Sequence, residues 1–223
     1  MQSWVNANKL VVNPAKTEYM IFGSQVRISR IVNPISIMLN GHEVKHTKTF
    51  KYLGVTLDQT LSWREHIIKM SKRIGSRISL LARSKKYLPT DGLKLLANSL
   101  ILPLFEYCSN CWSVCNRNVR VILIRQHKKM GRVILGAKTQ TPTTDVFREL
   151  KWVSIEERWR FRKCKMVFSA INNLTPPYVS NLLTKFGSLH SYRTRNVVNA
   201  GLILPKVKTN MGQQSFSFSA PST

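Results

Sequence analysis

A long amphipathic helix is the feature that most limits how this chain folds. Apolar residues recur at every third or fourth position after residue 62: Trp63, Ile67, Met70, Ile74, Ile78 and Leu81. This spacing puts all of them on one stripe of a helix, and other parts of the chain must cover that stripe. Ser62 and Glu65 have the spacing of a capping box, which predicts where the helix starts. The sequence therefore predicts a helical core built around this segment.

Further helical patterns follow along the chain. Residues 91–115 are nearly all apolar or small, which indicates a buried helix, and Pro103 is expected to kink or break it. Residues 117–135 again repeat apolar side chains at helical spacing, and Gly136 is typical of the position just past a helix end. A second capping-box pattern at residues 154–157 predicts the start of another helix.

Residues 1–60 have a different pattern. Short apolar runs alternate with turn residues, and Asn40-Gly41 is a strong hairpin signal. We expect a small antiparallel sheet here and an α+β fold overall. The expected regions are 1–60 for the sheet, 61–138 for a basic helical bundle, 139–183 for a small helical unit and 184–223 for a weakly structured tail.

The chain is strongly basic. It has 35 Lys and Arg residues against 10 Asp and Glu, a formal net charge of +25, and 43% of its residues are hydrophobic. We expect such a chain to bury a core and to bind a polyanion, because a polyanion relieves the repulsion between its cations. The expected nucleic-acid-binding residues lie on the polar faces of two helices: Arg64, Lys69, Lys72, Arg73, Arg77, Lys85, Lys86, Arg117, Arg120, Arg125, Lys128, Lys129 and Arg132. Binding through phosphates is independent of base sequence and steeply salt-dependent.

No apolar run is long enough to span a membrane, and the N-terminus lacks the layout of a secretion signal. We therefore expect an intracellular protein, nuclear or cytoplasmic, with no membrane partner. Cys108, Cys111 and Cys115 are followed by His127, a loose version of metal-ligand spacing. Buried free thiols are the commoner case in an apolar segment, so we expect no metal site. We also expect no cofactor and no small-molecule site.

Several short patterns occur in a fixed order along the chain. They are Trp4–Leu10, Asn13–Glu18, Phe50–Val55, Arg132–Gly136, Ile155–Arg158, Ala170–Asn173, Pro176–Tyr178 and Leu204–Lys206. Each pattern alone is weak, but their order and spacing together are specific. The chain resembles the reverse transcriptases of non-LTR retrotransposons (LINE-type, jockey-like), from the end of the polymerase palm through the thumb and the region after it. The resemblance covers nearly the whole chain.

The resemblance implies roles for particular residues. Lys16 matches the lysine of a palm motif near the triphosphate, and its role in this chain is expected to be vestigial. The segment containing Phe50, Tyr52, Leu53 and Gly54 resembles the primer grip. The basic helices resemble the thumb, which closes on a template–primer duplex of RNA and DNA. The full-length family uses Mg²⁺ for RNA-directed DNA synthesis.

In that family the metal-binding aspartates lie upstream of these motifs. We therefore expect a truncated polymerase that binds nucleic acid and does not synthesise it alone. None of the 10 acidic residues replaces those aspartates, because the one adjacent pair, Glu156-Glu157, falls in the first turn of an expected helix. Two-metal nucleotidyl transfer needs carboxylates that hold both ions.

Two alternatives stay open at this point. One alternative is a stand-alone basic helical protein that coats RNA or DNA. The chain is also compatible with a non-functional retroelement relic, since a sheet without its central strands exposes bare edges.

Overall fold

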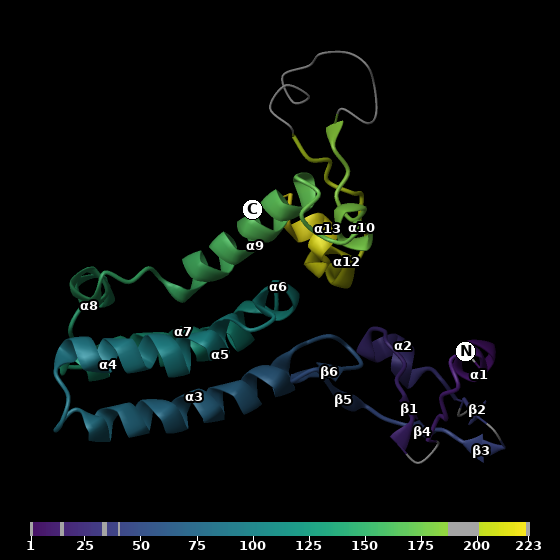
Figure 1. Ribbon diagram of the computed structural model, residues 1–223, viewed down its shortest axis with the longest axis horizontal. Coiled ribbons are helices and arrows are strands. Elements are labelled where there is room, and N and C mark those ends of the chain that lie inside the picture. The colour runs from purple at the N-terminus through teal and green to yellow at the C-terminus, as the bar shows by residue number, and fades with distance from the viewer. Residues whose placement is uncertain (1, 14–15, 33–34, 40, 187–200, 222–223) are drawn as a thin grey trace. The chain divides into compact units, whose positions relative to one another are not determined.

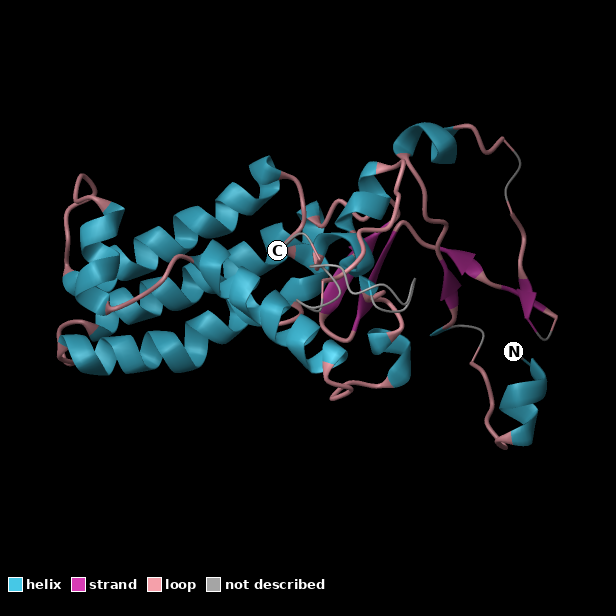
Figure 2. Cartoon of the chain, turned by 90° about the horizontal axis from the view of Figure 1, so that it is seen from above, coloured by secondary structure: helices cyan, strands magenta, loops and turns pink. Residues whose placement is uncertain are grey.

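The computed structural model describes residues 2–13, 16–32, 35–39, 41–186 and 201–221 (Figure 1). Helices and short strands are both present (Figure 2), which confirms the expected α+β class. The chain divides into two compact units, residues 1–66 and residues 67–223. In the part of the chain that the structure describes, no helix has the length and apolar character needed to cross a membrane.

The first unit contains short elements. They are α1 (Gln2–Ala7), β1 (Glu18–Tyr19), α2 (Gln25–Ser29), β2 (Met38–Leu39), β3 (His42–Glu43), β4 (Lys45–His46), β5 (Thr49–Tyr52) and β6 (Val55–Asp58). The strands form three two-stranded sheets, of which β1–β4 is parallel and the other two are antiparallel. The expected single antiparallel sheet is therefore replaced by separate pairs, because most of these strands are only two residues long.

Asp58 shapes the link from β6 to the long helix α3 (Arg64–Ser84). Its carboxylate accepts hydrogen bonds from the backbone N–H groups of Thr60, Ser62 and Trp63 at 3.1, 3.0 and 2.9 Å. Burial alone would raise the pKa of Asp58. The hydrogen bonds from these backbone groups and from the side chains of Thr60 and Ser62 outweigh the effect of burial and lower that pKa. Trp63 has a φ of 62° and α3 begins at Arg64, so the helix starts later than the capping box at Ser62 predicts.

The second unit is helical. Beyond α3 its elements are α4 (Thr90–Leu96), the π-helix η2 (Ala97–Ile101), α5 (Leu102–Glu106), α6 (Ser109–Trp112), α7 (Arg117–Leu135), α8 (Thr143–Leu150), α9 (Ile155–Ile171), α10 (Pro177–Ser180), α12 (Asn210–Gln214) and α13 (Phe216–Ser219). Its core includes fully buried side chains from α3 to α9: Ile74, Ile78, Leu93, Ile101, Phe105, Trp112, Leu123, Met130, Ile134, Leu150 and Ile155. Every long helix therefore contributes to one hydrophobic core.

Pro103 does not end the apolar helix outright. The chain widens into the π-helix just ahead of it and resumes as α5, an adjustment that suits a residue without a backbone N–H. The helix stops instead at Tyr107, and Cys108 takes a left-handed φ of 51°. This break turns Cys108 and Cys111 to the surface, so the expectation that they are buried is wrong. Cys115 is buried as expected, and all of these thiols are free.

Helix α7 begins and ends where the sequence predicts, and α9 begins where it predicts but ends at Ile171, before Pro176. Gly136 follows α7 with a φ of 69°, and the capping box between Ser154 and Glu157 is formed. On α7, Gly131 allows a close approach of α8, because a Cβ there would lie 2.9 Å from Cγ1 of Val146. The two helices are consequently packed with almost no space at this point.

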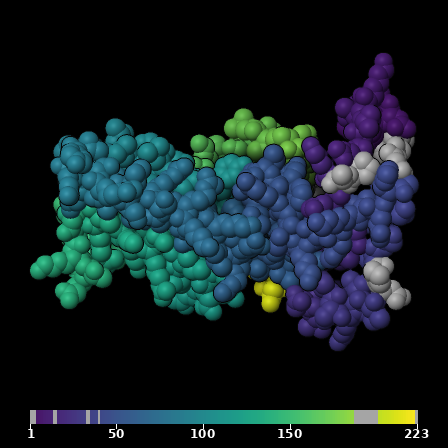
Figure 3. Space-filling view, turned by 90° about the horizontal axis from the view of Figure 1, so that it is seen from below, coloured from purple at the N-terminus to yellow at the C-terminus, as the bar shows by residue number. Residues whose placement is uncertain are grey.

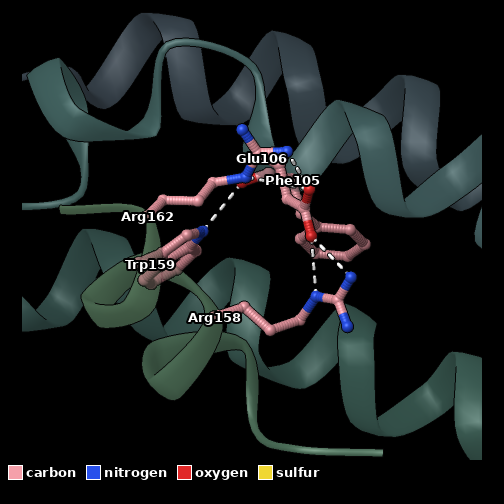
Figure 4. Close-up of polar contacts among 5 residues, drawn as sticks. All are labelled: Phe105, Glu106, Arg158, Trp159 and Arg162. Atoms are coloured by element: carbon pink, nitrogen blue, oxygen red, sulfur yellow. Dashed lines mark hydrogen bonds and ion pairs between the residues drawn. The ribbon is translucent and has the colours of Figure 1, made fainter. Parts of the chain in front are cut away.

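A set of polar contacts fixes α9 to the end of α5 (Figure 4). Glu106 accepts hydrogen bonds from Nε of Arg158 at 2.7 Å and from Nε of Arg162 at 2.9 Å. The indole N–H of Trp159 donates to the carbonyl of Phe105 at 2.7 Å. Burial alone would raise the pKa of Glu106, but the hydrogen bonds and charges of both arginines outweigh it and lower that pKa. These contacts join segments more than fifty residues apart.

Candidate nucleic-acid interface

The outer face of α3 carries exposed cations. Buried side chains of this helix occupy one stripe: Ile67, Met70, Ile74, Ile78 and Leu81. On the 3.6-residue periodicity, Lys69, Lys72 and Arg73 point to the opposite side, and all three are exposed. The helix has 21 residues and therefore spans about 30 Å. The Coulomb field of this face is positive, because Glu65 is the one acidic residue on α3.

Helix α7 repeats this arrangement. Its buried stripe comprises Val119, Leu123, His127, Met130 and Ile134. Arg117, Arg125 and Lys129 are exposed on the other side, with Lys128 half-buried beside them. Within the described ranges, Arg125, Lys128 and Lys129 take part in no ion pair. Their charges are thus unneutralised by the protein.

The two basic helices lie side by side. Nε2 of Gln126 on α7 donates to Oγ of Ser71 on α3 at 3.3 Å, and Gly75 leaves room for the same amide. In the space-filling view, side chains of α3 and α7 share one face of the second unit (Figure 3). The expected cations Lys72 and Arg73 are exposed on α3.

Arg77, Arg120 and Arg132, which are among the expected binding cations, also have contacts within the protein. Arg77 donates to the carbonyl of Leu100. Arg120 lies 3.5 Å from the Glu156 carboxylate. Arg132 donates to the carbonyl of Thr141 and to Oγ1 of Thr143, at 3.1 and 3.2 Å. The structure exposes the other expected residues on these helices and on the turn after α3, with Lys128 half-buried: Arg64, Lys69, Lys72, Arg73, Lys85, Lys86, Arg117, Arg125 and Lys129.

The primer-grip-like segment is a tight hairpin. Strands β5 and β6 pair Tyr52 with Val55, so Leu53 and Gly54 alone form the turn. Both turn residues have positive φ values, 45° and 84°, as a type I′ turn requires. Phe50, Tyr52 and Leu53 are 40%, 60% and 71% exposed. The hairpin tip therefore presents apolar side chains to solvent, unlike an ordinary hairpin with buried aromatics.

Lys16 lies in an exposed turn of the first unit. Its backbone N–H and the Thr17 hydroxyl both donate to the carbonyl of Asn13, at 3.1 and 2.8 Å. Residues 14–15 of the same motif lie outside the described residues.

The adjacent carboxylates at the start of α9 have structural partners. Glu156 pairs with Arg120, and Glu157 accepts a hydrogen bond from the Ser154 backbone N–H at 2.7 Å. The Ser154 hydrogen bonds lower the pKa of Glu157. Over the described ranges, His, Cys, Asp and Glu side chains form no group of three or more with the geometry of a metal site.

Sequence reasoning missed a cavity of about 590 Å³ between α7, α8 and the start of α9. His127, Phe147 and Trp152 contribute to its wall. These residues lie on separate elements, so no local motif in the sequence predicts the cavity. A second cavity of about 610 Å³ lies along α7 and is lined by Arg125, Lys128, Lys129 and Arg132.

The chain is similar in sequence to RNA-directed DNA polymerases of Drosophila mobile elements. It is 28% identical over 165 residues to the RNA-directed DNA polymerase from mobile element jockey of Drosophila funebris, covering 71% of this chain and 17% of that protein. It is 25% identical over 206 residues to the jockey polymerase of Drosophila melanogaster, covering 89% and 20%. It is 22% identical over 156 residues to the probable RNA-directed DNA polymerase from transposon X-element of Drosophila melanogaster, covering 68% and 16%.

These similarities confirm the resemblance stated from the sequence motifs. The chain spans about a fifth of the length of these curated relatives. No family model matches the chain. No solved structure matches it either.

Proposed function

We propose that this chain, a relative of the RNA-directed DNA polymerases of non-LTR retrotransposons, holds the template–primer duplex for reverse transcription. The observation that carries the proposal is the pair of adjacent helices, α3 and α7, with cations on the faces turned away from the core. The faces correspond to the thumb of such a polymerase. The duplex is gripped by its phosphates and not read by its bases.

The magnitude of the charge supports this role. The exposed basic residues lie along a helix of about 30 Å, and each strand of a duplex presents a phosphate every 3.4 Å or so. Contacts to roughly six to ten phosphates are therefore within reach of the two faces. Such a binding site needs few acidic residues, and α3 carries Glu65 alone while α7 carries none.

A salt titration of duplex binding tests the proposal. An RNA–DNA hybrid labelled with a fluorophore is titrated with the full chain at several concentrations of KCl, and affinity is measured by anisotropy. The expected logarithmic slope of affinity against salt is about −5 to −9, a loss of roughly 10³–10⁵ between 50 and 200 mM. A scrambled duplex sequence should bind equally well. An affinity that hardly changes with salt would overturn the proposal.

The exposed β5–β6 hairpin supports a second contact, with the end of the primer strand. Gly54 lets the backbone approach closely, and Tyr52 and Leu53 offer apolar surface. A photoreactive 5-iodouracil at the primer 3′ end is expected to crosslink within residues 50–54. Crosslinks confined to the second unit would refute this contact. Lys16 is proposed to be a vestige of the palm motif, so Lys16→Ala should leave duplex affinity within about twofold.

The proposal includes no DNA synthesis by this chain alone. Among its 10 acidic residues the one adjacent pair is Glu156-Glu157, and both members have structural partners. Neither residue is available to hold the Mg²⁺ ions that the full-length polymerases are expected to use. Primer extension by the purified chain with Mg²⁺ and deoxynucleotides is expected to give no product. Extended primer that depends on Mg²⁺ would refute this part of the proposal.

A further inference from the structure

The cavity between α7, α8 and the first turn of α9 has an aromatic wall. The rings of His127 and Trp152 are stacked, with centroids 5.4 Å apart and an angle of 17° between their planes. Phe147 tilts against both rings, at 4.8 and 6.5 Å. The cavity volume of about 590 Å³ lies in the range of pockets that enclose small organic groups. A flat aromatic ligand fits the chemistry of this wall.

Two ring nitrogens of the wall are buried without a hydrogen-bond partner in the described residues. They are Nε2 of His127 and Nε1 of Trp152, on side chains that are 1% and 9% exposed. Native structures pair nearly all such atoms, because a buried polar group without a partner is costly. Burial, with a contribution from Arg158, lowers the pKa of His127 to about 4. The imidazole is therefore neutral near pH 7 and offers both a donor and an acceptor.

The lining of the cavity carries charges of both signs, with Lys128 and Arg148 on one side of the balance and Glu156 and Glu157 on the other. Lys128 lines this cavity and also the neighbouring one, where Arg125, Lys129 and Arg132 join it. The carboxylates at the rim have partners already, since Glu156 lies 3.5 Å from Arg120 and Glu157 caps Ser154. A nucleic-acid strand whose phosphates lie in the neighbouring cavity would therefore continue past Lys128 to the aromatic wall.

We propose that the aromatic cavity binds the base of an unpaired nucleotide next to the duplex. The inference rests on the proposed function, because the phosphates of this strand are held by the cations of α7. A nucleobase has an aromatic face for Phe147 and the stacked rings. Its edge carries the donors and acceptors that the two ring nitrogens lack, and pairing with them requires the side chains of His127 and Trp152 to turn toward the base, because both nitrogens are closed to solvent in this structure. A purely apolar ligand leaves those nitrogens unpaired, and a free phosphate makes no use of the aromatic wall.

A comparison of three duplexes tests the inference with the unmodified protein. One is blunt, one has a three-nucleotide single-stranded extension, and one has the same extension built from abasic sugars. The last two carry the same phosphates, so any difference between them reports on the bases. The extension with bases is expected to bind roughly tenfold more tightly than the abasic one, as stacking on aromatic side chains predicts. Equal affinities would overturn the inference and leave the proposed function standing, provided that the blunt duplex still binds with the expected salt dependence.

Protein variants and crosslinking test the location. Trp152→Phe keeps an aromatic ring and removes the N–H. It should reduce the ratio of affinities between the extension with bases and the abasic extension, and leave the affinity for the blunt duplex unchanged. Trp159→Phe is the matched control, because it also removes a buried indole N–H but one that does not line the cavity. An equal loss of base preference in both variants would contradict the proposed location. A 5-iodouracil in the extension should crosslink to residues 143–157, and crosslinks confined to other segments would overturn the site whether or not the variants fold.

Discussion

Substitution of Glu106 by Gln is expected to destabilise the helical unit measurably. Glu106 accepts hydrogen bonds from Arg158 and Arg162 on α9, and its side chain is only 12% exposed. The amide of Gln has the same shape but carries no charge, and its NH₂ group faces an arginine. Two charge-assisted hydrogen bonds are therefore weakened at once, while Arg158 and Arg162 remain close together.

The size of the effect follows from the exposure of the arginines. Hydrogen bonds to charged groups contribute about 1.5–3 kcal/mol each when they are well buried. The side chains of Arg158 and Arg162 are 30% and 48% exposed, so solvent screening reduces this contribution. We expect a loss of about 2–3 kcal/mol, or roughly 4–12 °C in the melting temperature of a unit of this size.

Urea denaturation followed by circular dichroism measures this loss, with Asp145→Asn as the control. The ion pair of Asp145 with Arg148 is largely exposed and should be worth no more than about 0.5 kcal/mol. Because the pKa of folded Glu106 is depressed, the advantage of the wild type is present above the ordinary carboxyl pKa of 4.5 and disappears as pH falls through the folded value. Equal destabilisation by the two substitutions, or a difference independent of pH, would refute the structural role of Glu106.

Three further substitutions have defined outcomes. The pKa of His127 is about 4 in the folded chain and 6.5 for an ordinary histidine, so the folded chain should lose about 3 kcal/mol of unfolding free energy as pH falls from 6.5 to 4. His127→Phe should remove this pH dependence of stability, measured by urea denaturation. Gly131→Ala should destabilise by about 1 kcal/mol net, because the clash with Val146 outweighs the gain in helix propensity, whereas Gly75→Ala, whose nearest contact is 3.7 Å away, should not. Gly54→Ala should cost about 1 kcal/mol, because φ is +84° there, and hydrogen exchange at Val55 would reveal it as faster opening of the hairpin.

The sequence predicted the helices whose ends carry local signals. Gly136 ends α7 and the Ser154–Glu157 capping box starts α9, because both signals act within one turn of the backbone. The start of α3 was predicted too early. Asp58 binds the backbone of the preceding loop, and this contact depends on a turn geometry that periodicity does not reveal.

The remaining features depend on residues far apart in the chain. Glu106 meets Arg158 across 52 positions, and the cavity wall combines His127 from α7 with Trp152 from the loop after α8. Hydrophobic spacing indicates which face of each helix is buried, but it does not indicate which partners meet there. The cationic faces were predictable for the converse reason. Exposed residues such as Lys72 need no particular partner within the protein.

Charge removal on α3 tests duplex binding by the basic helices most directly. The triple variant Lys69→Gln, Lys72→Gln, Arg73→Gln is compared with Arg27→Gln, Arg30→Gln, Lys48→Gln, which changes the net charge equally at exposed positions of the first unit. If α3 contacts phosphates, the first variant should reduce the logarithmic salt slope for an RNA–DNA hybrid by about 2–3, since each lost contact removes about 0.9. The second variant should leave the slope nearly unchanged. Equal slopes in the two variants would contradict binding by α3, because net charge alone would then explain the affinity.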